Sequence, residues 1–157
     1  MARRRARELA FQALFQAARG GSDVLDVWDE VRSEAVAEEE DATYGDGLDA
    51  ETLALADRLV RTFEADRVAI DAELEHLIEG WTFGQMAQTD LNVLRLALAE
   101  RRARVDGPGE VTVEMAVRLA KRFGGEDSGR FVNGVLAKVL RHAADRPWPS
   151  SPGASAS

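Results

Sequence analysis

Hydrophobic residues recur every three or four positions along most of the chain, which is the spacing that places them on one face of an α-helix. The clearest case is the segment 113–140, which predicts a pair of helices. The apolar stripe of the first is Val113, Ala116, Val117, Ala120 and Phe123, and that of the second is Phe131, Val132, Val135, Leu136, Val139 and Leu140. Gly124 and Gly125 are expected to end the first helix, because glycine readily takes a positive φ. Asp127 or Ser128 is then expected to cap the second.

The same spacing predicts further helices upstream, over residues 3–19, 22–40, 50–65, 67–80 and 89–104. Ser22 is expected to cap the helix over residues 22–40, and Thr89 or Asp90 is expected to cap the helix over residues 89–104. The segment 67–80 reads either as a separate helix or as a kinked extension of 50–65. The segment 89–104 is apolar on nearly all sides, which predicts a central position in the core. About seven helices and no strand are expected, so the predicted fold class is all-α.

Glycine, proline and serine mark the boundaries of the predicted domain. Residues 1–144 form one helical domain, and a break near Gly80 and Gly84 divides it into two halves. Residues 38–49 read as a loop. The segment 145–157 is rich in proline, serine and alanine, and we predict a disordered tail there.

The composition excludes several classes of protein. Of the 157 residues, 45% are hydrophobic and 31% are charged, which is ordinary for a domain that buries a core. There is no cysteine, which excludes disulfides, a thiol nucleophile and a cysteine-ligated metal. The two histidines, His76 and His142, accompany no phosphate-binding loop, zinc motif or serine elbow, so we expect no catalysis, cofactor or metal. No apolar run would span a membrane and no signal peptide is recognisable, so we expect a cytoplasmic protein.

The net charge of −8 is unevenly distributed. Residues 23–51 hold twelve acids and one base, whereas residues 1–19 hold five arginines and one acid. Residues 118–146 hold seven bases and three acids. Two basic segments therefore bracket an acidic one, and this asymmetry points to an anionic partner such as nucleic acid.

Several residues are candidates for contact with nucleic acid, and each also has a purely structural interpretation. The N-terminal arginines are either phosphate-binding or a solubilising terminus. Phe15 and Phe131 could stack on bases, yet both also fit core stripes, Phe15 together with Phe11, Leu14 and Ala18. Asn133 could read a base edge or make a local bond at the start of its helix.

Three blocks in the same order resemble the bacterial antitermination factor family NusB: RRRARELAFQALFQ, VLRLALAE and AKRFGGEDSGRFVNGVLAKV. The resemblance covers residue 3 to about residue 140. It implies two packed three-helix bundles, at about 1–80 and 84–142. It also implies binding of single-stranded boxA RNA in ribosomal-RNA leaders together with NusE, a small-subunit ribosomal protein, within an antitermination complex on RNA polymerase.

The resemblance also implies particular site residues. Those expected to contact RNA are Arg3, Arg4, Arg5, Arg7, Phe15, Lys121, Phe123, Asp127, Arg130, Phe131 and Asn133. Asp90 and Arg95 are expected to face NusE, as a carboxylate and a guanidinium suited to ion pairs.

Two alternatives from other classes stay open. The first is a helical protein-interaction module, such as a homodimer scaffold in which the second copy covers the arginines. The second is a non-catalytic RNA-engaging domain related to those attached to ribosomal-RNA cytosine methyltransferases. Affinity that falls with rising salt would favour RNA binding.

Overall fold

The computed structural model describes residues 2–41 and 48–141 of the chain. Over these residues it contains six α-helices and one short 3-10 turn, which confirms the predicted all-α class. They are α1 (Ala2–Gly20), α2 (Val24–Asp41), α3 (Ala50–Leu77), η1 (Phe83–Gln85), α4 (Gln88–Arg102), α5 (Gly109–Gly124) and α6 (Glu126–Arg141). The predicted tail over 145–157, His142 and much of the predicted loop over 38–49 lie outside the described residues.

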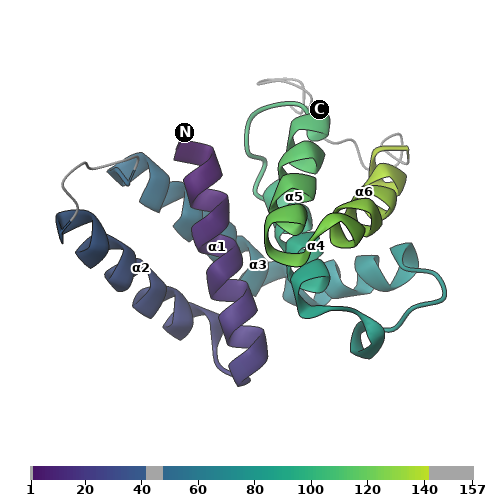
Figure 1. The fold of residues 1–157 in the computed structure, drawn as a ribbon, viewed down its shortest axis with the longest axis horizontal. Helices are drawn as coiled ribbons and strands as arrows, with labels where there is room; N and C mark the ends of the chain where they lie inside the picture. Colours follow the sequence, from purple (N-terminus) through teal and green to yellow (C-terminus); the bar gives the residue numbers. More distant parts are fainter. Residues whose placement is uncertain (1, 42–47, 142–157) are drawn as a thin grey trace.

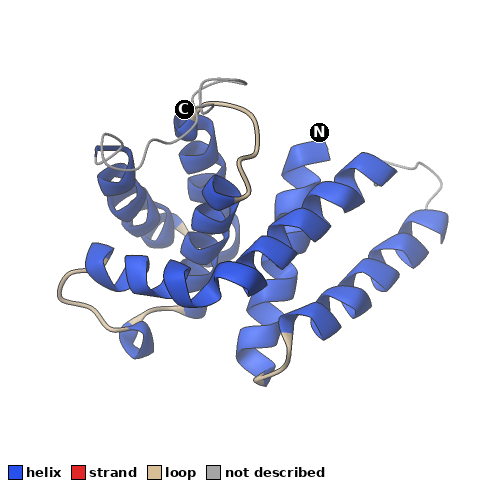
Figure 2. Cartoon of the chain, turned by 180° about the vertical axis from the view of Figure 1, so that it is seen from behind, coloured by secondary structure: helices blue, strands red, loops and turns tan. Residues whose placement is uncertain are grey.

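The helices form two groups of three (Figure 1). Helices α1, α2 and α3 pack against one another, and so do α4, α5 and α6, with the most extensive pairing between α5 and α6. Helices α1 and α3 also pack on α4, so the buried side chains of both groups form one continuous core. Seen from behind, the long α3 crosses the molecule from the first group to the second (Figure 2).

Helix α4 has the central position that its apolar sequence predicts. It packs on α1, α3, α5 and α6. Its buried hydrophobic side chains point in nearly all directions and are Leu91, Val93, Leu94, Leu96, Ala97, Leu98 and Ala99. Asn92 is also buried, and its side-chain amide donates to the Gln88 carbonyl oxygen at 2.8 Å.

Helix α3 resolves the uncertainty over residues 50–80. It is a kinked extension, because Asp66 has non-helical φ and ψ of −108° and 15° in an otherwise helical run. Asp49 caps the helix by accepting from the Thr52 backbone N–H at 2.8 Å. That hydrogen bond, followed by one from the Thr52 hydroxyl, holds the pKa of the Asp49 carboxyl below its ordinary value.

The predicted caps of three other helices are wrong. Helix α2 is capped by Asp23, whose carboxylate accepts from the Leu25 backbone N–H at 2.8 Å, and Ser22 lies one residue too early. Helix α4 begins after Ala87 without a side-chain cap. Asp127 and Ser128 lie inside the first turn of α6.

The cap of α6 fails because the joint between α5 and α6 is tighter than the sequence indicates. Helix α5 ends at Gly124, and Gly125, with φ of +93°, is the single residue between the helices. Ser128 instead donates its hydroxyl back to the Gly124 carbonyl oxygen at 3.2 Å. The predicted role of the two glycines in ending α5 is therefore correct, and it leaves no room for a separate cap.

Candidate nucleic-acid interface

The N-terminal arginines fall into two sets because α1 turns them toward different neighbours. Arg3 and Arg7, one turn apart, both face the second helix group. The Arg3 guanidinium donates to the Asp106 carbonyl oxygen in the loop before α5. Arg4 and Arg5 lie on the next strip of the helix, where Glu8 follows them by one turn.

Arg7 is buried, unlike the other three. Its Nε and a terminal nitrogen donate to the two carboxylate oxygens of Glu100 on α4, at 2.7 and 2.8 Å. Thr112 on α5 donates its hydroxyl to the same carboxylate at 2.6 Å. The side chains of Arg7 and Glu100 are only 9% and 3% exposed. Arg7 thus joins α1, α4 and α5 inside the protein, and its guanidinium is already paired with Glu100.

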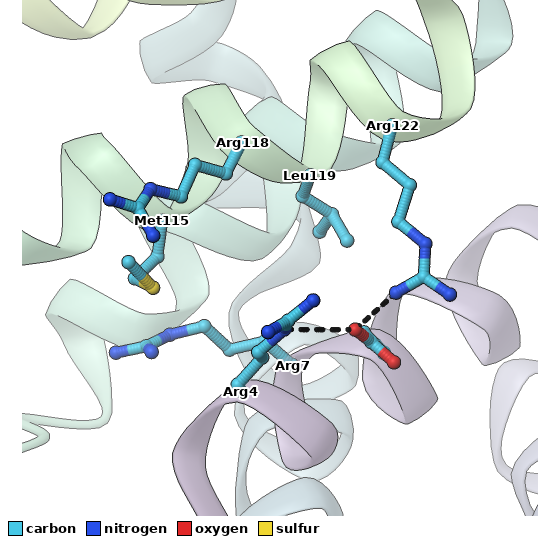
Figure 3. Close-up of a pocket in the computed structure, with 7 residues that line it drawn as sticks. Arg4, Arg7, Met115, Arg118, Leu119 and Arg122 are labelled. Atoms are coloured by element: carbon cyan, nitrogen blue, oxygen red, sulfur yellow. Dashed lines mark hydrogen bonds and ion pairs between the residues drawn. The ribbon is translucent and has the colours of Figure 1, made fainter. Parts of the chain in front are cut away.

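Glu8 brings the two basic segments of the sequence together. Its carboxylate forms ion pairs with Arg4 at 3.5 Å and Arg5 at 3.6 Å, and it also accepts from Arg122 at the end of α5. Figure 3 shows Arg4 and Arg122 approaching this carboxylate from the two helices, with Arg118 one turn before Arg122 on α5. Residues separated by more than a hundred positions in the sequence therefore form one cationic surface.

Two hollows meet at Glu8 and Arg122. The smaller, of about 120 Å³, is the one drawn in Figure 3, and it is lined by Arg4, Arg7, Glu8, Met115, Arg118, Leu119 and Arg122. The larger, of about 530 Å³, is lined by Arg5, Glu8, Phe11, Gln12, Phe15, Gln16, Arg19, Thr89, Arg122 and Phe123. We call the two together the α1–α5 groove. The volume of the larger hollow is in the range of roughly 300–1,000 Å³ found for ligand sites.

A row of aromatic rings lines the larger hollow. Phe123 stacks on Phe11 with centroids 5.1 Å apart, and Phe11 lies 5.6 Å from Phe15. An arginine covers each end of the row, Arg122 over Phe123 at 5.2 Å and Arg19 over Phe15 at 5.6 Å. Aromatic rings with guanidinium groups beside them combine the two kinds of group that bind single-stranded nucleic acid, rings for bases and cations for phosphates.

Two of these rings were expected in the core from their periodicity. Phe123 is 48% exposed, so the prediction that it belongs to the buried stripe of α5 is wrong, and Leu119 is buried instead. The reason is that Phe123 lies in the last turn of α5, where its ring covers Phe11 at the rim of the protein. Phe15 is half-buried, and Ala18 is exposed, because α1 packs through its alanine-rich side. Ala6, Ala10, Ala13 and Ala17 are the buried alanines.

The charged residues at the joint of α5 and α6 are exposed and paired locally. Lys121 lies 3.9 Å from Glu126, and Arg130 is paired with Asp127. The two helices approach so closely that a Cβ at Gly129 would lie 2.5 Å from the Lys121 Cγ. Glycine there lets the lysine lie across α6.

Phe131 and Asn133 lie on opposite flanks of α6, since residues two apart on a helix differ by about 200°. The half-buried Phe131 ring meets Trp81, which follows α3, edge-on with centroids 5.8 Å apart. Asn133 is exposed on the flank of Gly129, and its side chain makes no hydrogen bond to the described part of the chain. The structure therefore gathers Arg4, Arg5, Arg7 and Phe15 with Phe123 at the groove. Arg3 lies instead against the loop before α5, and Phe131 belongs to a different surface.

Asp90 and Arg95 differ in their surroundings on α4. Arg95 binds Asp71 of α3 through two hydrogen bonds of 2.9 and 3.0 Å, and its guanidinium covers the Phe83 ring at 5.5 Å. Asp90 has a buried carboxylate oxygen, Oδ1, with no hydrogen-bond partner among the described residues. Asp90 thus has one buried oxygen without a partner among the described residues, while Arg95 is already paired within the chain.

Sequence reasoning missed several residues of the groove. Glu8 was counted only as an acid within a basic segment. The expectation that Phe11 belongs to the core is correct, but its position beside the larger hollow was not predicted. Gln12, Gln16 and Arg19 share a helical face with Glu8 at intervals of three and four, which is the signal that could have identified them. Within the described ranges no helix is long and apolar enough to cross a membrane, and no cluster of potential metal ligands is found.

The sequence profile of the NusB family matches residues 4–141. The chain is 47% identical over 142 residues to the transcription antitermination protein NusB of Thermus thermophilus, covering 90% of this chain and 92% of that protein. Among solved structures, T. maritima NusB matches with a TM-score of 0.76 and 33% identity, over 89% of this chain and 91% of that one. A complex of the antitermination factors NusB and NusE with dsRNA matches with a TM-score of 0.74 and 25% identity, over 89% and 96%. The chain belongs to the NusB family.

Proposed function

We propose that this protein is an RNA-binding transcription antitermination factor. It binds the boxA element of ribosomal-RNA leaders together with NusE and joins a complex on RNA polymerase that suppresses termination. The observation that carries the proposal is the convergence of two basic segments on one groove lined with aromatic rings. A structural relative solved with NusE and dsRNA supports the same reading.

In the proposed complex, the groove binds the backbone and bases of a single strand with different groups. Arg4 and Arg5 in the groove, and Arg3 beside it, pair with phosphates, since guanidinium groups form strong charge-assisted hydrogen bonds with them. Phe15 and Phe123 stack on unpaired bases, an interaction worth about 1–3 kcal/mol per base. Arg7 supports the groove from beneath through its bonds to Glu100.

The RNA path continues from the groove around the joint of α5 and α6. Lys121, Arg130, Asp127 and Asn133 are exposed there and offer two cations, an acceptor and an amide. Phe131 contacts RNA only if the strand continues to the side of α6 where Trp81 lies, since its ring does not face the groove.

We propose that NusE contacts α4 at Asp90 and at Arg95, which lies between one and two turns further along the helix. The half-buried carboxylate of Asp90 would pair with a cationic side chain of NusE. Asp90→Asn is the better test of this contact, because Arg95 also holds α3 through Asp71. The variant should weaken NusE binding and leave RNA binding by the free protein unchanged.

We further propose that the protein is not an enzyme and acts in the cytoplasm, where bacterial transcription takes place. Residues 1–144 would form one functional unit, since the groove takes residues from both helix groups and cannot form from either alone.

The test is equilibrium binding of a fluorescent boxA RNA to the wild type and to a variant with Arg3, Arg4 and Arg5 changed to alanine, each with and without NusE. The variant should bind more weakly, and its salt slope should be shallower by about 0.7 for each phosphate that an arginine no longer pairs. A matched control changes Arg32, Arg61 and Arg67 to alanine, since these exposed arginines lie on α2 and α3. If both variants bind as the wild type does, the groove is not the RNA site.

A further inference from the structure

We propose that in the free protein the Glu8 carboxylate occupies the binding site of an RNA backbone phosphate, and that this phosphate displaces the carboxylate when RNA binds. We call this binding site the seat. The inference rests on the proposed function and names one site within it. The seat consists of the guanidinium groups of Arg4 and Arg5 from α1 and of Arg122 from α5.

The geometry is that of an anion site that already holds an anion. The three guanidinium groups meet at one carboxylate, and the Glu8 side chain is only 15% exposed. Carboxylate and phosphate oxygens both accept charge-assisted hydrogen bonds from guanidinium, so a group that suits one also suits the other. Three cations around one carboxylate leave an excess of positive charge, which favours a further or stronger anion.

The stability of the free protein does not explain this cluster. The side chains of Arg4, Arg5 and Arg122 are 71%, 37% and 54% exposed, and ion pairs of exposed arginines contribute little to stability. Arg4 and Arg5 also lie in the first turns of α1, at the positive end of the helix dipole, where cations are unfavourable. The arrangement is better explained by an external anion than by folding.

Access to the seat supports the exchange. Glu8 lines both hollows of the groove, so its carboxylate has open space on either side into which it can turn. A strand lying along the groove would cross the seat between the two hollows. The displaced carboxylate would remain close to the incoming phosphate, and the two like charges would repel. Glu8 therefore holds the arginines of two helices together in the free protein and opposes RNA in the complex.

The test compares Glu8→Gln with the wild type in binding a fluorescent single-stranded boxA RNA. The amide has the size of the carboxylate and lacks its charge, so affinity should rise about fivefold, the factor expected for unit charges about 4 Å apart in a water-like dielectric. The salt slope should steepen by up to about 0.7, because the displaced carboxylate no longer neutralises one of the cations that face the RNA. A purely structural role for Glu8 would not change the slope in this direction.

Glu30→Gln is the matched control, because it removes the same charge from an exposed position on α2. Glu8→Ala is a second variant that tests the same charge, and circular dichroism verifies the helical content of each. The inference is overturned if the wild type binds RNA and both Glu8 variants bind no more tightly than Glu30→Gln. If the wild type does not bind the RNA, the proposed function fails and the seat has no ligand.

Discussion

Replacing Arg7 should lower the free energy of unfolding more than replacing Arg3, Arg4 or Arg5. The change Arg7→Met removes a guanidinium that binds both oxygens of Glu100 in the interior, where the pair is 9% and 3% exposed. Removing one partner of such a pair typically costs about 3–5 kcal/mol, because the remaining charge stays buried without compensation. Thr112 still donates to Glu100, which places the expected cost near the lower end.

The assay is urea denaturation and thermal unfolding of Arg7→Met, with Arg5→Met as the control. For a chain of this length, a loss of about 3 kcal/mol lowers Tm by about 10 °C, whereas Arg5→Met should change it by at most about 2 °C. The double variant Arg7→Met, Glu100→Met should be more stable than the sum of the single changes by about 2 kcal/mol. The structural role of this pair would be refuted if Arg7→Met lowered the free energy of unfolding by less than about 1 kcal/mol. It would also be refuted if the effects of the two single changes simply added in the double variant.

Three further changes test other parts of the structure. Phe123→Ala should weaken boxA RNA binding by about 1–3 kcal/mol with an unchanged salt slope, since it removes stacking and no charge; an unchanged Kd would remove Phe123 from the RNA path. Gly125→Ala should lower the free energy of unfolding in urea by about 1–3 kcal/mol, because its φ of +93° and ψ of −176° are open almost only to glycine, and a neutral effect would contradict the tight joint. Arg95→Met should lower the free energy of unfolding in urea by about 1–2 kcal/mol, because it leaves Asp71 unpaired. The same change made in a protein that already carries Asp71→Asn should cause no such loss.

The sequence predicted several features that depend on local chemistry, although it misplaced the caps of α2, α4 and α6. The kink of α3 at Asp66 lies between the two segments that the apolar spacing separates, although the sequence left open whether the second segment is a separate helix. The end of α5 at Gly124 followed from the conformational freedom of glycine. The central position of α4 followed from its lack of a polar face. Each of these depends on residues within a few positions of one another.

The features that the sequence did not predict depend on contacts between distant residues. Arg7 reads like Arg5 in the sequence, and only its position opposite Glu100, 93 residues away, makes it structural. Phe123 fits an apolar stripe, yet the end of its helix reaches the rim of the core, so its ring is half exposed. Glu8 owes its role to Arg122, 114 residues away. The spacing of apolar residues predicts which face of a helix is buried. It does not predict which residues of other helices pack against that face.

The central claim is that RNA lies in the groove between α1 and α5, and photocrosslinking tests it most directly. A boxA RNA with 4-thiouridine at successive positions would be irradiated with the wild-type protein, and the crosslinked peptides would be mapped by mass spectrometry. The proposed interface predicts crosslinks in α1 and at the end of α5, at or beside Phe15 and Phe123, because these rings lie in the groove. Crosslinks confined to α2, or to the surface around Trp81, would contradict it.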